Sequence, residues 1–385
     1  MVRKITSNFS QSVQFFTRYI YFAATTCDKN DSNHRMFVLE NTNPDPFNGT
    51  FVLKGQITDS TNKWAIDGTV FTHPTGQLYF AWSGWETNVP LGRQMLYIAK
   101  MSNPWTITGA RVEISRPTYT WETMNKAYVN EGPQFIQNKG VISLVYSASG
   151  SWTNNYCLGL LTASNTSNLL NATSWTKRST PVFQSGNGII APGHNCFTKS
   201  FDGKEDWIIY HSARYNNSGW IRQVRAQKFT WNADSTPKFG TPAAPNTPIT
   251  IPSGDPMRVR YEAENATIRS GPAVLASTTA SKGMKVGYID YSTSTVTFTI
   301  QAATAGTHVV ALRTDNGSPQ NSTATHLLSI NNGTFSSFSI ANGGWDNWGV
   351  VMFRTYFKLG TNTITCKKGN NYAEIDSVDI FLNPS

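Results

Sequence analysis

The sequence predicts an all-β protein with two domains, a β-propeller followed by a β-sandwich. Long amphipathic helical patterns are absent, and short aromatic or β-branched runs alternate with Gly, Pro, Asn and Asp. This alternation is typical of strands and turns. The first part of the chain repeats with a period of about 60 residues. A proline-rich segment follows the repeats, and 385 residues exceed the usual size of one domain.

The repeat consists of an aromatic strand and the strand that follows it. The aromatic strands are expected at residues 19–24 (YIYFAA), 78–83 (LYFAWS), 144–148 (LVYSA) and 207–213 (WIIYHSA). Their partners are expected at residues 35–39, 94–100, 156–162 and 224–230. Each period is long enough for one four-stranded blade, which is why the repeat favours a propeller.

Three polar residues precede successive aromatic strands at nearly constant spacing. Asp67, Glu131 and His194 are separated by 64 and 63 residues. Equivalent strand positions in successive blades face one central channel, so these side chains are expected to converge. Two carboxylates in one pocket suit glycoside hydrolysis, in which one donates a proton and the other activates water or attacks. Alternatively, both carboxylates cap turns beside Gly68 and Gly132.

Composition predicts a linker and a second domain after the repeats. Residues 240–257 contain five prolines in eighteen positions, which favours a stiff, extended connection. The domains are therefore expected at residues 1–240 and 258–385, with the linker at 241–257. Strands of the second domain are expected at 296–300, 308–313, 326–330, 350–357 and 361–367, a count that suits a sandwich.

Charge and composition narrow the function classes. The net charge is +9, but the basic residues are scattered, so nucleic-acid binding is not expected. No stretch approaches the roughly 20 apolar residues of a membrane-spanning helix. Aromatic residues make up 12% of the chain, and their flat faces suit sugar rings. Frequent Asn-X-Ser/Thr sequons favour an extracellular protein, although no signal peptide is visible.

Several ordered motifs between residues 18 and 240 resemble glycoside hydrolase family 43, and within it the fungal and bacterial α-L-arabinofuranosidases. They lie at 63–71 (KWAIDGTVF), 80–85 (FAWSGW), 97–107 (YIAKMSNPWTI), 129–133 (VNEGP), 144–152 (LVYSASGSW), 191–197 (APGHNCF) and 225–231 (RAQKFTW). The resemblance implies an inverting hydrolase on a five-bladed propeller.

The same resemblance implies roles for the three spaced residues. Glu131 matches the general acid, whose pKa would be raised by partial burial. Asp67 matches the carboxylate that tunes and orients the acid. His194 matches a histidine near the propeller axis that holds an ion or an ordered water; a structural histidine is the alternative.

Three further residues are expected around the substrate. Arg225 matches a substrate-side arginine, with an ion pair inside the blade as the alternative. Trp82 and Trp85 are expected to wall the pocket, with a core position for at least one as the alternative.

The resemblance also shows a departure at the N-terminal side. Relatives carry an Ala-Asp-Pro type motif whose Asp is the catalytic base, and neither that motif nor its following strand is found here. Asp28 and Asp31 lie in a polar loop, and Asp45 lies between two prolines. The expectation is therefore an N-terminally incomplete propeller in which the base is not present.

The last part of the chain resembles carbohydrate-binding modules of families 35 and 6, which form a jelly-roll β-sandwich. The resemblance lies in residues 261–266 (YEAENA), 344–348 (GWDNW) and 370–381 (NNYAEIDSVDIF). It implies a structural calcium ion held by Glu262, Glu264 and Asp379, with Asp376 as an alternative to the last. An acidic edge strand without a metal is the other interpretation.

The binding module is also expected to hold sugar. Trp345 or Trp348 would stack on a sugar ring while Asn371 hydrogen-bonds its hydroxyls, and one of the two tryptophans is expected in the core. Such a site would tether the enzyme to polysaccharide.

These observations predict release of α-L-arabinofuranose from arabinan or arabinoxylan by a secreted monomer without an organic cofactor. A non-catalytic carbohydrate-binding protein and a β-xylosidase acting on xylan are the alternatives.

Overall fold

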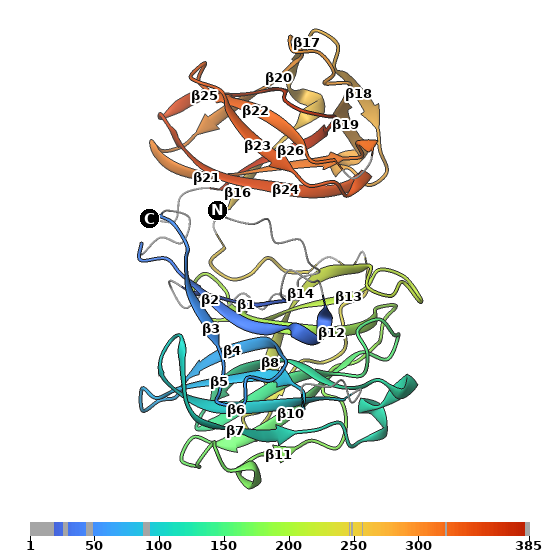
Figure 1. Ribbon diagram of the computed structural model, residues 1–385. Coiled ribbons are helices and arrows are strands. Elements are labelled where there is room, and N and C mark those ends of the chain that lie inside the picture. Colours follow the sequence, from blue (N-terminus) through green and yellow to red (C-terminus); the bar gives the residue numbers. More distant parts are fainter. Residues whose placement is uncertain are drawn as a thin grey trace. The chain divides into compact units, whose positions relative to one another are not determined.

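The computed structural model describes residues 19–25, 30–43, 49–87, 93–245, 247, 249–255, 257–319 and 322–381. The chain divides into two compact units, residues Met1–Gly254 and Asp255–Ser385 (Figure 1). Helical structure among the described residues is limited to short 3-10 turns: η1 (Asp31–Asn33), η2 (Thr120–Glu122), η3 (Met124–Lys126), η4 (Ala172–Ser174), η5 (Ala263–Asn265) and η6 (Ser281–Gly283). In these ranges no helix is long and apolar enough to cross a membrane.

Antiparallel sheets made of consecutive strands build the first unit. One sheet has three strands, β1 (Tyr19–Ala24), β2 (Arg35–Glu40) and β3 (Val52–Ile57). Three runs of four strands follow, of which the first two join in one eight-stranded sheet and the third forms a sheet of its own. They are β4 (Ala65–Thr72), β5 (Leu78–Gly84), β6 (Arg93–Asn103) and β7 (Thr106–Ser115); β8 (Tyr128–Asn138), β9 (Val141–Ala148), β10 (Cys157–Ser164) and β11 (Thr176–Lys177); and β12 (Ile190–Lys199), β13 (Asp206–Ala213), β14 (Arg222–Trp231) and β15 (Pro237–Lys238). A short parallel pairing joins β6 to β8.

Each run packs against the next through a buried core. Tyr21 of β1 shares a cluster with Phe80 of β5, and Leu96 of β6 shares one with Leu144 of β9. A third cluster joins β9 and β10 to β13 and β14. The four aromatic strands expected from the repeat are β1, β5, β9 and β13. Their aromatic and aliphatic side chains fill these clusters because strands that are buried on both faces need apolar residues at successive positions.

The predicted linker is corrected by contacts that its composition does not reveal. Gln227 of β14 donates from Nε2 to the carbonyls of Phe239 and Thr241 and accepts from the backbone N–H of Ala243. Ser253 donates from Oγ to Asp202 Oδ2 at 2.6 Å. Residues 241–254 therefore belong to the first unit, and the boundary moves from residue 240 to Gly254.

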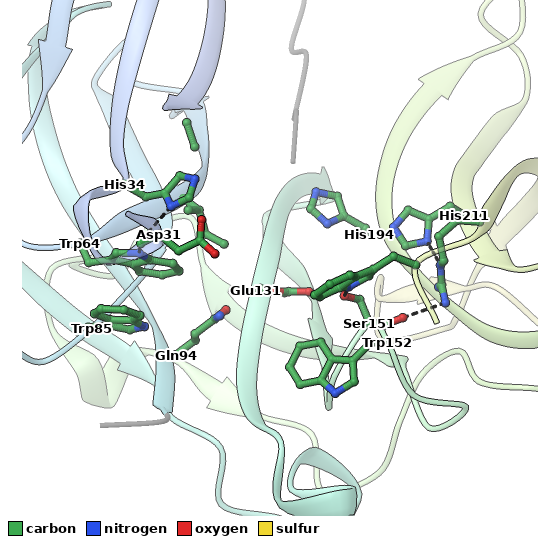
Figure 2. A pocket seen from close by; sticks show the side chains of 14 residues that line it. Asp31, His34, Trp64, Trp85, Gln94, Glu131, Ser151, Trp152, His194 and His211 are labelled. Carbon is green, nitrogen blue, oxygen red and sulfur yellow. Dashed lines mark hydrogen bonds between the residues drawn. The ribbon is translucent and has the colours of Figure 1, made fainter. Parts of the chain in front are cut away.

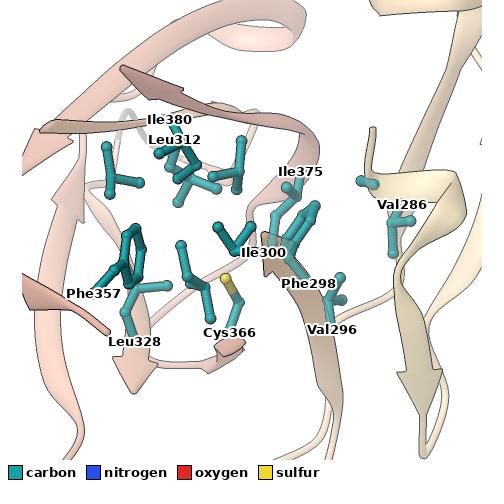
Figure 3. Close-up of a cluster of buried hydrophobic side chains, with 14 of the residues drawn as sticks. Val286, Val296, Phe298, Ile300, Leu312, Leu328, Phe357, Cys366, Ile375 and Ile380 are labelled. Atoms are coloured by element: carbon teal, nitrogen blue, oxygen red, sulfur yellow. The ribbon is translucent and has the colours of Figure 1, made fainter. Parts of the chain in front are cut away.

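The second unit contains two antiparallel sheets. One is formed by β16 (Arg258–Glu262), β18 (Ala273–Ala276), β19 (Met284–Gly287), β21 (Gly306–Asn316), β24 (Gly344–Phe357) and β26 (Glu374–Phe381). The other is formed by β17 (Thr267–Arg269), β20 (Thr295–Ala302), β22 (Ala324–Ile330), β23 (Ser336–Ile340) and β25 (Gly360–Lys368). The inward positions of both sheets meet in one core, where Leu312 and Ile380 of the first sheet share a cluster with Phe298 and Cys366 of the second (Figure 3). The five strands expected from the sequence lie within β20, β21, β22, β24 and β25.

Candidate active site

The first unit contains a cavity of about 1040 Å³ with an aromatic and ionisable lining (Figure 2). Its lining includes Asp31, Trp64, Trp85, Gln94, Glu131, Trp152, His194, His211, Trp220 and Arg222. These residues come from all three sheets of the first unit and their connecting loops. The cavity is large enough for a ligand of several rings.

Irregularities in three equivalent strands aim polar groups toward one place. The strand register slips between Ile66 and Thr69 in β4, between Glu131 and Gln134 in β8, and between Gly193 and Cys196 in β12. A bulge bends a strand and turns a side chain that regular pairing would place elsewhere. Each of the three predicted residues lies at one of these slips.

The structure brings Asp67, Glu131 and His194 together around Gly132. Asp67 is 1% exposed, and its Oδ2 accepts a hydrogen bond from the Gly132 N–H at 3.1 Å. A Cβ atom on Gly132 would lie 3.3 Å from the His194 ring, and Gly132 has φ +57°. Glycine is therefore needed at this position on two grounds, the close approach of the ring and the left-handed backbone.

Glu131 is a buried carboxyl group whose pKa is raised to about 8. Burial is the largest cause, because a charged carboxylate loses hydration there, and the negative charge of Asp67 adds to it. Two groups act in the opposite direction: Tyr156 donates its hydroxyl to Glu131 Oε1 at 2.6 Å, and the charge of Arg222 also favours the carboxylate. At neutral pH Glu131 therefore holds a proton that it can donate into the cavity.

A stack of rings from the loop before β10 and from β12 and β13 supports this carboxyl group. Tyr156 is fully buried and lies parallel to His211, with ring centroids 5.9 Å apart and planes 7° apart. His211 in turn stacks on His194 at 5.7 Å. Burial lowers the pKa of His211 to about 3, with the charges of His194 and Arg222 contributing, so the ring is neutral. Its Nδ1 accepts a hydrogen bond from Arg222 Nε at 2.8 Å.

His194 keeps one nitrogen available toward the cavity. Its Nε2 is buried and has no hydrogen-bond partner among the described residues, while its backbone N–H donates to Ser147 Oγ at 2.7 Å. A buried nitrogen of this kind needs a partner such as water or an ion.

Two predicted pocket residues lie elsewhere. Trp82 is 3% exposed and packs against Phe80 and Tyr97 in a core cluster, so it does not line the cavity. Arg225 does not line it either, and its Nε donates to Ser212 Oγ at 2.7 Å. Side chains alternate along a strand, so a spacing of three puts Arg225 and Arg222 on opposite faces of β14. Arg222 is the arginine of the site, and the sequence analysis missed it.

Trp85 does line the cavity, as expected. Its ring lies flat on that of Trp64, with centroids 4.3 Å apart and planes 4° apart. Trp64 is fixed by a hydrogen bond from its Nε1 to the Asp31 carbonyl at 2.7 Å. Trp64 is not predicted by the sequence pattern, and Asp31, expected only in a polar loop, also lines the cavity.

In the second unit, the predicted calcium ligands do not form one group. Asp379 is held by Arg260, whose Nε and Nη2 each donate to one carboxylate oxygen at 2.7 Å. Within the described residues no set of three His, Cys, Asp or Glu side chains is arranged to hold a metal ion.

The alternative ligand, Asp376, lies close to Glu262. The backbone N–H of Ser281 donates to Asp376 Oδ1 at 2.7 Å, and the Ser281 hydroxyl donates to Glu262 Oε1 at 2.9 Å. Oε2 of Glu262 and Oε2 of Glu264 are buried and find no hydrogen-bond partner in the part of the chain that the structure describes. Hard, unpartnered oxygens of this kind fit calcium, so Glu262 and Glu264 remain candidate ligands. Asp376, like Asp379, is paired with an arginine, Arg313.

The predicted sugar-binding residues of the second unit are at its surface. Trp345 is 48% exposed and covers Gly317, where a Cβ atom would lie 2.3 Å from the indole. Trp348 is half-buried, with the guanidinium of Arg313 5.2 Å from its ring centroid. Neither tryptophan belongs to the core, which corrects the expectation for one of them. Asn371 is exposed and donates from Nδ2 to the Thr323 carbonyl at 2.7 Å.

Comparison with known proteins gives a family match over the first unit. The family "Glycosyl hydrolases family 43" matches residues 15–237. An extracellular exo-α-(1→5)-L-arabinofuranosidase of Streptomyces avermitilis is 44% identical over 245 residues, which are 61% of this chain and 50% of that protein. α-L-Arabinofuranosidase 43 of Humicola insolens is 37% identical over 262 residues, 66% of this chain and 52% of that protein. The chain thus spans about half the length of these curated relatives.

A solved structure matches the same region. The crystal structure of α-L-arabinofuranosidase from Lactobacillus brevis is 37% identical, covers 62% of this chain and 77% of its own, and superposes with a TM-score of 0.56.

Proposed function

The chain belongs to glycoside hydrolase family 43, and we propose that it hydrolyses α-L-arabinofuranosyl linkages in plant polysaccharide such as arabinan or arabinoxylan, with inversion. The names of its relatives support arabinofuranose as the released sugar. The repeated four-stranded runs and their shared cores support a propeller, for which we propose five blades.

The environment of Glu131 is the observation that carries this proposal. A glycosidic oxygen leaves only slowly as an alkoxide, so the reaction needs an acid that is still protonated at neutral pH. Burial and the charge of Asp67 raise the pKa of Glu131 to about 8 and provide this acid in the wall of the cavity. Asp67 would thus act by keeping the proton on Glu131, and its hydrogen bond from Gly132 fixes its position.

Inversion also needs a carboxylate that removes a proton from the attacking water. In the described part of the cavity lining, Asp31 is the second carboxyl group besides Glu131. Its backbone carbonyl is held by Trp64 and by His34 Nδ1 at 2.8 Å, so the turn that carries it is fixed. We therefore assign Asp31 as the first residue to test for this role.

The second unit is proposed to be a jelly-roll carbohydrate-binding module that tethers the hydrolase to polysaccharide. The exposed Trp345 supports a sugar-stacking role, and the unpartnered oxygens of Glu262 and Glu264 support a structural calcium ion. The extracellular relative from Streptomyces avermitilis supports secretion, and we propose a monomer without an organic cofactor. An ion or ordered water on His194 Nε2 completes the proposal.

Sugar binding without hydrolysis is the second candidate. The exposure of Asp31 favours this candidate, because a solvated carboxylate is not held in a fixed position beside an attacking water. The unaltered chain separates the candidates, because oligosaccharide binding without release of sugar would establish the second. In an active chain, loss of hydrolysis by Asp31→Asn with retained oligosaccharide binding assigns Asp31 to catalysis, and unchanged hydrolysis excludes it.

The proposal is tested by hydrolysis of arabino-oligosaccharides and xylo-oligosaccharides by the full chain. We expect arabinose to be released, and Glu131→Gln to lower kcat/KM by about 10²–10⁴-fold. Glu113→Gln is the matched control, because Glu113 pairs with Arg116 on β7 and does not line the cavity. Equal activity of the two variants would remove Glu131 as the acid. Release of xylose instead of arabinose would establish the β-xylosidase alternative.

A further inference from the structure

Two exposed tryptophans form the outer part of the cavity lining. Trp152 lies in the loop between β9 and β10, and Trp220 lies in the loop between β13 and β14. Their side chains are 46% and 70% exposed, and the rings meet edge to face with centroids 5.9 Å apart. Large aromatic rings are rarely left this exposed without a partner, and here two of them border the candidate active site.

Polar contacts hold the two loops, and thereby the rings, in place. Trp220 donates from Nε1 to Ser151 Oγ at 3.0 Å, and Arg222 donates from Nη1 to the Ser151 carbonyl at 3.0 Å. Asn154 donates from Nδ2 to the side-chain oxygens of Asn216 and Asn217 at 2.7 and 2.6 Å. Because the indole N–H of Trp220 is already used inside the protein, the ring offers a ligand its apolar face. The two rings therefore form a fixed platform, the Trp152–Trp220 platform, which loses little conformational entropy when a ligand binds.

The platform is connected to the acid by one residue. Arg222 holds Ser151 on one side and, on the other, hydrogen-bonds His211 and lies over the Tyr156 ring at 5.4 Å. Tyr156 is the residue that donates to Glu131. The opposite wall is different, because Trp64 and Trp85 cover each other's faces; Figure 2 shows them across the cavity from Trp152.

We propose that Trp152 and Trp220 form a binding subsite for a neutral sugar ring in the leaving part of the substrate. The proposal rests on the proposed function, because the acid must stand beside the oxygen that departs with this part. The leaving chain then extends from Glu131 toward solvent, where the two indole rings lie. The C–H faces of a furanose or pyranose ring complement an indole face, which is apolar and electron-rich.

The subsite is tested by nuclear magnetic resonance of ¹⁵N-labelled indole groups in the full chain carrying Glu131→Gln, which prevents turnover. The signals are assigned by single Trp→Phe substitutions. We expect the Trp152 and Trp220 signals to shift with arabinotriose or xylotriose and not with the corresponding monosaccharides. Trp175 is the internal control, because its indole is buried and bonded to the Leu169 carbonyl. Stationary signals with both trisaccharides, or equal shifts with monosaccharides, would overturn the subsite whether or not the chain hydrolyses them.

Kinetics provide a second test on the otherwise unaltered chain. Trp220→Ala is expected to raise KM for the hydrolysed trisaccharide about tenfold, the loss of one stacking contact. The same substitution should leave kcat/KM for arabinofuranosyl fluoride within about twofold, because fluoride is too small to reach the platform. An equal loss on both substrates would show that Trp220 supports the fold of the cavity instead of binding the leaving sugar.

Discussion

Two buried glutamates of the first unit, Glu131 and Glu122, have similar burial and opposite titration behaviour. Glu122 is fully buried, and Tyr146 donates its hydroxyl to Glu122 Oε1 at 2.9 Å. Glu131 is 7% exposed and receives the corresponding hydrogen bond from Tyr156. Yet the pKa of Glu131 is raised to about 8, whereas the pKa of Glu122 is lowered.

The difference lies in the charge that faces each carboxyl group. Burial raises the pKa of Glu122 as well, but Lys177 at 2.7 Å and the backbone N–H groups of Tyr119 and Thr118 outweigh it. Glu131 faces the negative charge of Asp67 instead. A tyrosine hydroxyl alone therefore does not keep a buried carboxyl ionised, and the neighbouring charge decides whether it becomes a structural anion or a proton donor.

Removing the lysine should have the largest effect. Lys177→Met leaves the buried Glu122 carboxylate without its counter-charge, and we expect the free energy of unfolding to fall by about 3–5 kcal/mol. The exposed pair of Lys199 with Asp206 is the control, and Lys199→Met should cost less than about 1 kcal/mol. Urea denaturation measures both. A loss for Lys177→Met no larger than that for the control would mean that Glu122 is not held as an anion.

Glu131 should make stability depend on pH in the opposite direction from Glu122. Between the ordinary glutamate pKa of 4.5 and about 8, the folded protein keeps the proton of Glu131 and the unfolded chain loses it. Stability therefore falls as pH rises through this window, by up to about 1.4 kcal/mol per pH unit. The lowered pKa of Glu122 instead contributes stability that is lost as pH falls below 4.5. The free energy of unfolding of Glu131→Gln, measured by urea denaturation, should thus increase relative to that of the wild type between pH 5 and 7. A difference between the two proteins that does not change with pH would contradict the raised pKa of Glu131.

Asp67→Asn should change the pKa of Glu131 while leaving Glu131 itself unaltered. Loss of the negative charge lowers the pKa of Glu131, so the alkaline limb of the kcat/KM profile should move to lower pH. The isosteric amide keeps an oxygen that accepts from Gly132, so the bulge is expected to persist. An unmoved or higher limb, with the fold intact by circular dichroism, would mean that Asp67 does not act on Glu131 through its charge.

Tyr156→Phe should have the smallest effect, and it should shift the pKa of Glu131 in the opposite direction from Asp67→Asn. The lost hydrogen bond had favoured the carboxylate, so the pKa of Glu131 rises and the alkaline limb moves to higher pH. Tyr210→Phe removes an equally buried hydroxyl bonded to Gln227 and should leave the limb in place. A merely structural role of Tyr156 would lower activity at every pH without moving the limb.

The sequence located the centre of the site because repeats carry positional information. Asp67, Glu131 and His194 recur at nearly equal spacing, and each lies at a register slip in the first strand of its run. Tyr156 and His211 were missed, since they come from other positions of the repeat and no spacing connects them. Their place depends on how neighbouring sheets pack, which a pattern along one strand does not contain.

The sequence pattern also does not decide which side of a strand faces the cavity. Trp82 and Trp85 are three residues apart and so face opposite sides of the chain. The sequence does not show which side faces the core and which faces the cavity. Arg222 and Arg225 pose the same problem on β14. The Pro-rich residues 241–254 had the composition of a linker, yet hydrogen bonds from Gln227 and Ser253 tie them to the first unit.

The titration of Glu131 itself decides whether this residue is the proton donor. Carbon-13 resonances of labelled glutamate carboxyl groups report each group separately, with Glu131→Gln and Glu122→Gln used for assignment. We predict that the Glu131 signal titrates near pH 8, while the Glu122 signal titrates below the ordinary glutamate value of 4.5. A Glu131 signal that titrates near 4.5, together with the exposed glutamates, would contradict its assignment as the proton donor.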